Sequence, residues 1–393
     1  MNKKKFILVV NSGSSTIKFK IYDNDGFNTV LCGNFERIGL DNSFYNIEET
    51  SSKRIIFKNF PAGIKNHEQA LRVIVNLIGH WRNKIYGIGH RIVHGGEKFT
   101  KSTVLNQKKI LRIEKYNELA PLHNPINLSC AKICLENFRP TVKNVGVFDT
   151  AFFKTLPDYA YLYPIPYEYY ADLKIRRYGF HGISHEYAAE TAAEKINLPL
   201  GRLRVITCHL GSGSSVTAIK KGRAVATSMG FTPLEGLMMG TRCGDIDPAI
   251  SLFLQRRINL DVDKVDDLLN KKSGLLGIFK YSSDMRDILV ASGYKVTGYR
   301  CSKKFSNKET VMAKLALKMF VYNVRRYIGS YAAILGGVDV VVFTGGIGQN
   351  STIRKLIMSG LKLNSKYKIV AVKANEELKI AKEVFKTLKK GMC

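Results

Sequence analysis

The chain has 393 residues, is 45% hydrophobic, and carries 61 Lys and Arg against 32 Asp and Glu, which gives a formal net charge of +29. It is long enough for two domains with buried cores and too apolar to be a disordered chain. The charge is spread along the chain without a long basic helix or an arginine-rich arm. We therefore expect a lysine-rich surface that attracts anionic substrates, and no nucleic-acid partner.

The cysteines and the apolar runs indicate the cellular compartment in which we expect the protein. The seven cysteines are scattered and include no C-x-x-C pair, so they predict neither a disulfide framework nor a zinc site. Reduced thiols fit the cytoplasm. The apolar run at 6–10 is too short for a signal peptide, and no run approaches the roughly 20 residues of a membrane span, so we expect no membrane partner.

The first predicted element pair is a strand, a glycine turn and a second strand. Residues 6–10 are apolar and β-branched, 11–15 read Asn-Ser-Gly-Ser-Ser, and 16–22 alternate as a strand does. The pattern recurs where 203–210 run into Gly-Ser-Gly-Ser-Ser at 211–215. The repeated Ser-Gly-Ser-Ser is either chance or a duplicated hairpin, and duplication predicts two related halves that face each other across a cleft.

A third glycine turn follows an apolar run at 338–343. Residues 344–350 read Thr-Gly-Gly-Ile-Gly-Gln-Asn and lead into a predicted helix from Ser351. A strand, a glycine turn and a helix place a helix N-terminus beside an anion.

Helical patterns at 186–195 and 311–335 lie between the predicted strands, so the fold class is α/β. Residues 156–170 are rich in Pro and Tyr and are typical of a connector. We expect a domain break near residue 150.

Three segments concentrate charged and imidazole side chains. Residues 91–97, Arg-Ile-Val-His-Gly-Gly-Glu, are either a turn with surface charges or an anion site, and planar Arg pairs well with carboxylate or phosphate oxygens. Residues 176–185 hold two Arg and two His, a density that core packing explains poorly. Within 229–248, Arg242 is flanked by small residues, which suits an anion.

Two further side chains stand out. Asp149 follows an apolar run at the edge of a predicted strand, where catalytic carboxylates tend to lie. His123 lies between prolines in a rigid loop, and a structural role for it is equally consistent with the pattern.

Together the glycine turns, the cations Arg91, His181 and Arg242, and the carboxylates Asp149 and Glu376 suit Mg²⁺-dependent phosphoryl transfer, in which catalysis is mostly positioning and charge stabilisation. The chain has neither a G-x-x-x-x-G-K-[ST] loop nor an H-R-D motif. This excludes P-loop and protein-kinase architectures.

Seven motifs resemble the acetate kinase family from one end of the chain to the other. They are 11–15 with Lys18, 89–97, 120–125, 148–152, 176–185, 229–249 and 343–350. The resemblance implies the α/β fold shared by acetate kinases, sugar kinases and actin, with two duplicated ribonuclease H-like domains around an ATP cleft. It implies an N-terminal domain of 1–150 plus a returning helix in 382–393, a nucleotide-binding domain of 151–381, and a homodimer.

The resemblance also implies an activity. This is reversible transfer of a phosphoryl group from ATP to acetate, giving acetyl phosphate and ADP by direct in-line attack of the carboxylate, with Mg²⁺ and with Mn²⁺ as an alternative metal. Propionate and butyrate kinase remain alternatives, because one or two methylenes are worth only about 1 to 3 kcal/mol in a pocket. The intact set of cations argues against a non-catalytic scaffold, and the dispersed charge without an aromatic platform argues against nucleic-acid binding.

The site residues implied by the resemblance fall into five groups. Asn11 and Glu376 would bind Mg²⁺, and Arg91 would hold the substrate carboxylate. Asp149, His181 and Arg242 would surround the transferred phosphoryl group. The small apolar pocket and its border would comprise Val93, Leu122, His123, Phe180 and Pro233. The nucleotide would contact Ser12, Ser14, Lys18, His209, Leu210, Gly211, Ser212, Gly213, Asp284, Met285, Arg286, Gly345, Gly346, Ile347, Gly348 and Gln349.

Three positions depart from the family pattern: Ser212 stands where Asn is usual, Cys243 where Ser is usual, and Gln349 where Glu is usual. We expect activity with altered nucleotide affinity. An aliphatic acid, like a Glu side chain, has a pKa of roughly 4.3 to 5 and is already ionised at neutral pH, so its attack needs no general base. We therefore expect Asp149 to position Mg²⁺ and the attacking group.

Overall fold

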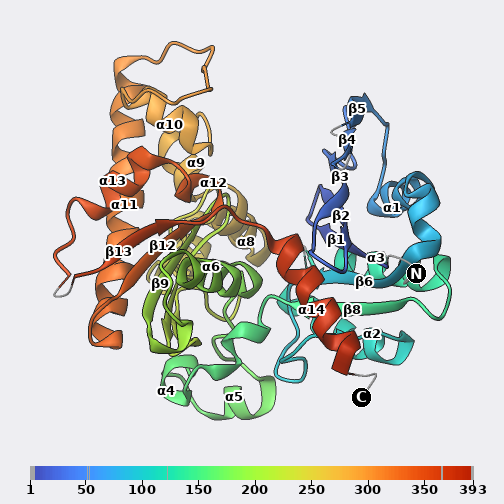
Figure 1. The fold of residues 1–393 in the computed structure, drawn as a ribbon. Helices are drawn as coiled ribbons and strands as arrows, with labels where there is room; N and C mark the ends of the chain where they lie inside the picture. The colour runs from blue at the N-terminus through green and yellow to red at the C-terminus, as the bar shows by residue number, and fades with distance from the viewer. Residues whose placement is uncertain (1–4, 51, 53, 122, 364–365, 391–393) are drawn as a thin grey trace. The chain divides into compact units, whose positions relative to one another are not determined.

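The computed structural model describes residues 5–50, 52, 54–121, 123–363 and 366–390. They form two compact units. The first comprises the chain up to Lys154 together with the segment from Asn375, and the second comprises Thr155–Ala374. Both units combine a β-sheet with packed helices (Figure 1).

The first unit is built on an eight-stranded sheet in the order β5-β4-β3-β2-β1-β6-β8-β7. Its strands are β1 (Phe6–Ser12), β2 (Ile17–Asp23), β3 (Thr29–Glu36), β4 (Phe44–Glu49), β5 (Arg54–Pro61), β6 (Ile85–Ile92), β7 (Thr103–Val104) and β8 (Lys143–Phe148). Its helices are α1 (His67–Leu77), α2 (Gln107–Glu114), α3 (Asn124–Asn137) and α14 (Glu376–Lys390), with 3₁₀ turns at Gly79–Lys84, Asn117–Leu119 and Ala151–Thr155.

Alternation along β1 divides the two faces of this sheet. Leu8 and Val10 belong to a buried core that includes residues of α1 and α3. On the other face α14 packs against β1, β6 and β8. Its approach is close because β6 has Gly89 there: a Cβ on this glycine would lie 2.5 Å from Ile380 Cγ2 and 3.7 Å from Val9 Cγ2. The C-terminal helix therefore fits against a strip of sheet that lacks a side chain.

The second unit has a five-stranded sheet in the order β11-β10-β9-β12-β13. Its strands are β9 (Arg204–Leu210), β10 (Ser214–Lys220), β11 (Arg223–Thr227), β12 (Val340–Thr344) and β13 (Lys368–Ala371). Its helices are α4 (Asp158–Tyr161), α5 (Glu168–Leu173), α6 (Gly182–Lys195), α7 (Ala249–Ile258), α8 (Val262–Lys271), α9 (Gly274–Phe279), α10 (Met285–Ala291), α11 (Asn307–Leu335), α12 (Gly345–Gly348) and α13 (Ser351–Met358), with a 3₁₀ turn at Leu200–Arg202.

The faces of the second sheet are divided in the same way. Ile206 and Cys208 lie in the core that includes residues of α11 and α13. The next side chain along β9, Thr207, points to α6, where its hydroxyl lies 2.7 Å from His185 Nδ1. Helix α11 is held at both ends, by a capping box of Ser306 and Glu309 and by Gly336 with a left-handed φ of 69°.

The two sheets share one topology, which confirms the predicted duplication and the α/β class. In the first unit β3, β2 and β1 are antiparallel neighbours, and β6 and β8 then add in parallel. In the second unit β11, β10 and β9 are antiparallel neighbours, and β12 and β13 add in parallel. Each Ser-Gly-Ser-Ser segment lies at the turn of the equivalent hairpin, β1-β2 or β9-β10.

Several predicted elements differ in extent from those observed. Helix α6 begins at Gly182 rather than at 186, directly after His181, and α14 begins at Glu376, before the predicted returning segment of 382–393. The Pro- and Tyr-rich segment at 156–170 contains the short helix α4 and the start of α5. Within the described ranges, no helix is both long and apolar enough to cross a membrane.

Candidate active site

Arg91 lies at the centre of a charged cluster in the first unit. It comes from the end of β6, Asp149 follows β8, Asn11 is near the end of β1, and Glu376 is the first residue of α14. Strands β1, β6 and β8 run in parallel, so their carboxyl ends meet at one edge of the sheet. The backbone N–H of Asp149 donates to the carbonyl of Ile92 at 3.0 Å and joins two of these ends.

The guanidinium of Arg91 is held by acidic groups. Its Nε and Nη2 donate to Asp149 Oδ2 at 3.0 and 2.6 Å, and its Nε lies 3.9 Å from Glu376 Oε2. Its Nη1 lies 3.5 Å from Asn11 Oδ1. Burial lowers the pKa of Arg91, but Asp149 and Glu376 more than offset this and raise it above its ordinary value. Arg91 therefore stays charged and in a fixed position.

Two buried amides shape the loops around Arg91. Asn127 of α3 donates to the carbonyl and hydroxyl oxygens of Ser12, both at 2.9 Å, and accepts from the N–H of Val93 at 3.2 Å. Asn124 accepts from the N–H of His94 at 2.9 Å and donates to its carbonyl at 3.0 Å. The N-terminal turn of α3 thus connects the β1-β2 turn with the segment after β6.

His181 lies in the second unit, where its left-handed backbone, with a φ of 58°, starts α6. Its Nδ1 is 2.9 Å from Ser215 Oγ, and its ring stacks on His209 with centroids 4.3 Å apart. A Cβ on Gly213 would lie 3.2 Å from His181 Nε2 and 3.8 Å from Arg242 Nη1. His181, Arg242 and the β9-β10 turn therefore meet at one place.

Arg242 is bound differently from Arg91. Its Nη1 donates to the carbonyl of Pro233 at 3.0 Å and lies 3.6 Å from Met239 Sδ. Within the described part of the chain it pairs with no carboxylate, and burial lowers its pKa. Its positive charge is uncompensated, which favours the arrival of an anion.

The nucleotide segments predicted in the second unit lie close to one another. Gly345, with a φ of 78°, packs on the turn backbone, since a Cβ there would be 2.4 Å from the carbonyl oxygen of Leu210. A Cβ on Gly240 would lie 3.4 Å from the Ser212 carbonyl oxygen and 3.5 Å from Ser283 Cβ. The β9-β10 turn is therefore adjacent both to α12 and to the segment that precedes Asp284.

Several of the residues predicted to bind the nucleotide already form hydrogen bonds within the protein. The N–H of Gly211 donates to Gly213 O at 3.1 Å and closes the turn. Asp284 caps α10 through Arg286 N at 2.8 Å and also accepts from the Arg286 side chain. Gln349 Nε2 donates to the carbonyl of Val372 at 2.8 Å, a bond that a Glu in this position could not make.

The remaining predicted residues are divided between the units. Val93 is buried in the first unit, His123 is half-buried at the start of α3, and Leu122 lies outside the described residues. Phe180 is buried and Pro233 half-buried in the second unit. Ser14 and Lys18 are exposed in the first unit.

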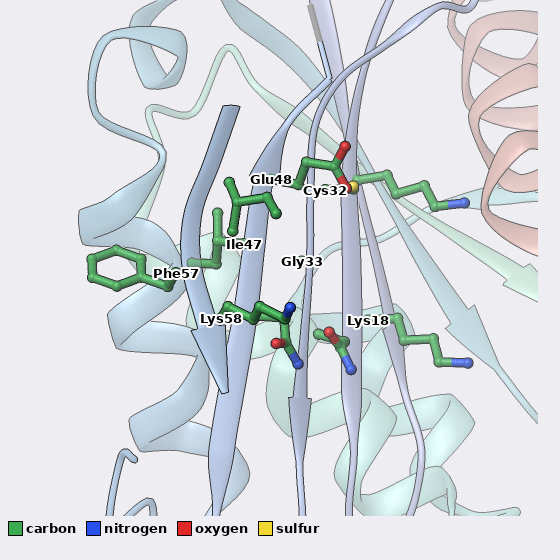
Figure 2. A pocket seen from close by; sticks show the side chains of 11 residues that line it. Lys18, Cys32, Gly33, Ile47, Glu48, Phe57 and Lys58 are labelled. Carbon is green, nitrogen blue, oxygen red and sulfur yellow. The ribbon is translucent and has the colours of Figure 1, made fainter. Parts of the chain in front are cut away.

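Lys18 lines a groove of about 380 Å³ on one face of β2, β3, β4 and β5. Figure 2 shows Lys18 of β2 and Lys58 of β5, which both line this groove. Lys20, Asn34 and Asn46 also line it.

Sequence reasoning missed Glu377 and Lys20. Glu377 Oε1 accepts from Asn11 Nδ2 at 2.9 Å, and Glu377 Oε2 lies 3.3 Å from Lys20 Nζ. The alternation of Lys18 and Lys20 on one strand face and the Glu-Glu pair at 376 and 377 were the available signals. The two Arg in 176–185 are structural: Arg177 bonds Glu235 and three carbonyls, and Arg176 lies 3.6 Å over the ring of Tyr161.

Comparison with known proteins decides the family. The model of the acetokinase family matches residues 6–364. The chain belongs to the acetokinase family. It is thus a kinase, a phosphotransferase, as its sequence predicted. The acetate kinase of Halothermothrix orenii is 44% identical over 407 residues, which cover 96% of this chain and 98% of that protein.

Solved structures of this family agree with the fold. The crystal structure of Porphyromonas gingivalis acetate kinase has a TM-score of 0.83 at 36% identity and covers 98% of this chain and 100% of its own. A propionate kinase from Francisella tularensis also has a TM-score of 0.83 at 36% identity, with coverages of 96% and 98%. The similarity to these two structures therefore does not decide between acetate and propionate as the substrate.

Proposed function

We propose that the protein is an acetate kinase that transfers a phosphoryl group reversibly between ATP and acetate, giving acetyl phosphate and ADP. The observation that carries the proposal is the setting of Arg91, fixed by carboxylates where β1, β6 and β8 end, in a chain of the acetokinase family. A planar guanidinium at a strand-end cluster is suited to hold a carboxylate. Propionate or butyrate is the alternative acid.

Arg91 would bind the acid and Arg242 with His181 would face the phosphoryl group. Attacker and phosphate are both anions, so cations that bring them within about 3 Å of each other do most of the work. The acid is ionised at neutral pH and needs no base. Asp149, which pairs with Arg91, would orient the guanidinium rather than carry a proton. Val93, Phe180 and Pro233, with Leu122 and His123, would border the methyl group.

The residues around Arg91 fit Mg²⁺. Asn11 Oδ1 and the carboxylates of Glu376 and Asp149 are hard oxygen donors, and Mg²⁺ takes one or two carboxylates together with water and substrate phosphates. The described residues contain no group of three or more His, Cys, Asp or Glu that could hold a metal by themselves. Asn11 and Glu376 would hold the ion, with Mn²⁺ as an alternative, and the ion would neutralise phosphate charge.

ATP and ADP would bind at the glycine turns. Ser12, Ser14 and Lys18 would contact the phosphates. In the second unit the β9-β10 turn, residues 284–286 and α12 with Gln349 would contact the nucleotide, and their proximity supports this assignment. The cysteines in the described ranges carry free thiols, which suits the cytoplasm, the location we propose.

A homodimer is the proposed assembly. Helix α7 has no buried residue, yet it carries Ile250, Leu252 and Phe253 on an exposed surface, with Phe253 62% exposed. The loop before α7 is tied to α11, because Asp245 accepts from Arg326 and Tyr327. Exposed large apolar side chains that occur together on one helix are typical of an interface.

Steady-state kinetics with two-, three- and four-carbon acids tests the choice of acid. We expect the highest kcat/KM for acetate, and roughly 10- to 200-fold less per added methylene if the pocket is closed at the methyl group. A higher kcat/KM for propionate would make the enzyme a propionate kinase.

A further inference from the structure

Asn11 has only one orientation of its side-chain amide that satisfies its neighbours. Its Nδ2 donates to Glu377 Oε1 at 2.9 Å, while its Oδ1 lies 3.5 Å from Arg91 Nη1. A carboxylate only accepts hydrogen bonds and a guanidinium only donates them. Glu377 therefore decides that the oxygen of Asn11, and not its nitrogen, faces Arg91.

Glu377 is itself held in place. It is 8% exposed, and a buried carboxylate is costly unless it is paired. Lys20 Nζ lies 3.3 Å from Glu377 Oε2 and donates to Asn375 Oδ1 at 3.1 Å. The two oxygens of Glu377 are thus held apart, one by Asn11 Nδ2 and the other by Lys20 Nζ.

Asn375 is the anchor at which the chain enters the first unit. Its Oδ1 accepts from Lys20 Nζ, from the Tyr22 hydroxyl at 3.3 Å and from Leu378 N at 3.4 Å. Lys20 and Tyr22 belong to β2, and Asn375 directly precedes α14. The start of α14 is therefore fixed to β2 before Glu377 reaches Asn11 on β1.

We propose that Lys20 and Glu377 are positioning residues which fix the carboxamide of Asn11 with its oxygen toward Arg91. Lys20 on β2 contacts Glu377 on α14, and Glu377 contacts Asn11 on β1. Asn11 in turn faces Arg91 on β6. The inference rests on the proposed function, because that function assigns Mg²⁺ and the substrate carboxylate to Asn11 and Arg91.

Single substitutions test the two residues. The measured quantity is the Kd of Mn²⁺ in the presence of ADP, monitored by electron paramagnetic resonance. Glu377→Gln and Lys20→Met keep side-chain size and remove charge. We expect each to weaken Mn²⁺ binding, by about 10- to 100-fold for Glu377→Gln, as for other residues that orient metal ligands. Lys58→Met is the matched control, since Lys58 lines the same groove as Lys20, and it should bind as the parent does. Unchanged binding in Glu377→Gln would overturn the proposal.

A double variant tests whether Lys20 acts through Glu377. Lys20→Met combined with Glu377→Gln should bind Mn²⁺ no worse than Glu377→Gln alone. Lys20→Arg, which keeps the charge, should restore binding relative to Lys20→Met. Multiplied losses in the double variant would contradict action through Glu377.

Exchange of the amide and the carboxylate tests the orientation itself. Asn11→Asp alone sets two carboxylates against each other and should weaken Mn²⁺ binding and lower the midpoint of urea unfolding. Asn11→Asp with Glu377→Gln restores a donor opposite an acceptor and should recover both readouts. A double variant no better than Asn11→Asp would overturn the proposal. If the parent protein binds Mn²⁺ and the exchange succeeds while no acid is phosphorylated, the proposed function fails and the positioning role stands.

Discussion

At the scale of single residues, the two proposed catalytic arginines differ in how their charge is balanced. Arg91 is paired with Asp149 and lies near Glu376, whereas Arg242 bonds only a carbonyl and a sulfur among the described residues. A compensated cation is suited to orient a ligand by geometry. An uncompensated cation contributes most where negative charge arrives.

This difference predicts distinct kinetic defects for the two arginines. Arg91→Ala should mainly raise the KM for the acid, and Arg242→Ala should mainly lower kcat, with losses of roughly 3 to 5 kcal/mol in kcat/KM. Steady-state kinetics with the acid and ATP varied separately measures both. The reverse pattern would show that the roles have been exchanged.

The sequence predicted the site residues as a set but not their partners. Arg91 and Asp149 were recognisable because glycines and apolar runs mark strand ends. Glu377 was not, because its role depends on a contact with Asn11 across 366 positions of the chain. The structural roles of Arg176 and Arg177 were equally hidden, since a dense cluster of charged residues looks functional until its partners are known.

At the scale of elements, helix α14 depends on glycines in β6. A Cβ on Gly87 would lie 2.8 Å from Val384 Cγ1, and a Cβ on Gly89 would lie 2.5 Å from Ile380 Cγ2. These contacts bring the start of α14, with Glu376, to the edge where β6 ends. The family resemblance implied a returning C-terminal helix but gave no sign of which strand it would meet.

We predict that Gly89→Ala displaces α14 and lowers both stability and kcat/KM. The added methyl overlaps Ile380 and Val384, and overpacking costs typically 1 to 3 kcal/mol. Gly329→Ala on α11 is the control, because a Cβ there would meet no described atom within 4 Å apart from the neighbouring backbone of its own helix. Urea unfolding and steady-state kinetics report the effect. A Gly89→Ala variant that unfolds like the control would show that the packing has room.

The stability of the first unit should fall in mild acid because of His90 on β6. Burial lowers the pKa of His90 to about 4, although a hydrogen bond with Asn144 opposes the shift. Below the ordinary His pKa of about 6.5 the unfolded chain takes up a proton that the folded unit refuses, so the free energy of unfolding drops as the pH falls toward 4. His90 alone should cost about 2 kcal/mol between pH 7 and pH 5.

His90→Gln isolates this contribution, because Gln can keep a donor near Asn144 without titrating. Urea unfolding at pH 7 and pH 5 should show a smaller loss of stability in the variant than in the parent. Equal losses would mean that His90 is protonated in the folded unit at pH 5.

At the scale of the whole molecule, the repeated Ser-Gly-Ser-Ser motif left chance and duplication open, and the complete duplicated α/β fold was expected from the resemblance to the acetate kinase family. The prediction of a duplicated hairpin is confirmed. It succeeded because a strand, a tight glycine turn and a strand form a local unit that sequence patterns describe well. The order of the parallel strands and the placing of α6 could not be predicted from sequence patterns, since they depend on contacts distant in the chain. The return of the C-terminal helix to the first unit was expected only from the family resemblance.

The proposed dimer makes a prediction at the same scale. Phe253→Asp on α7 should shift the protein from dimer to monomer in sedimentation velocity, because it places a charge in the apolar surface. Tyr159→Asp is a matched control on α4, since Tyr159 is also highly exposed. A parent protein that sediments as a monomer would contradict the proposed dimer. Dissociation by Tyr159→Asp alone would show that the interface lies at α4 and not at α7.

The central claim is that this chain phosphorylates a small carboxylate. Incubation with ATP, Mg²⁺, acetate and hydroxylamine tests it directly, because hydroxylamine traps acyl phosphate as the hydroxamate. We predict acetohydroxamate in proportion to the ADP released. ADP without hydroxamate, or no reaction with any short acid, would contradict the claim.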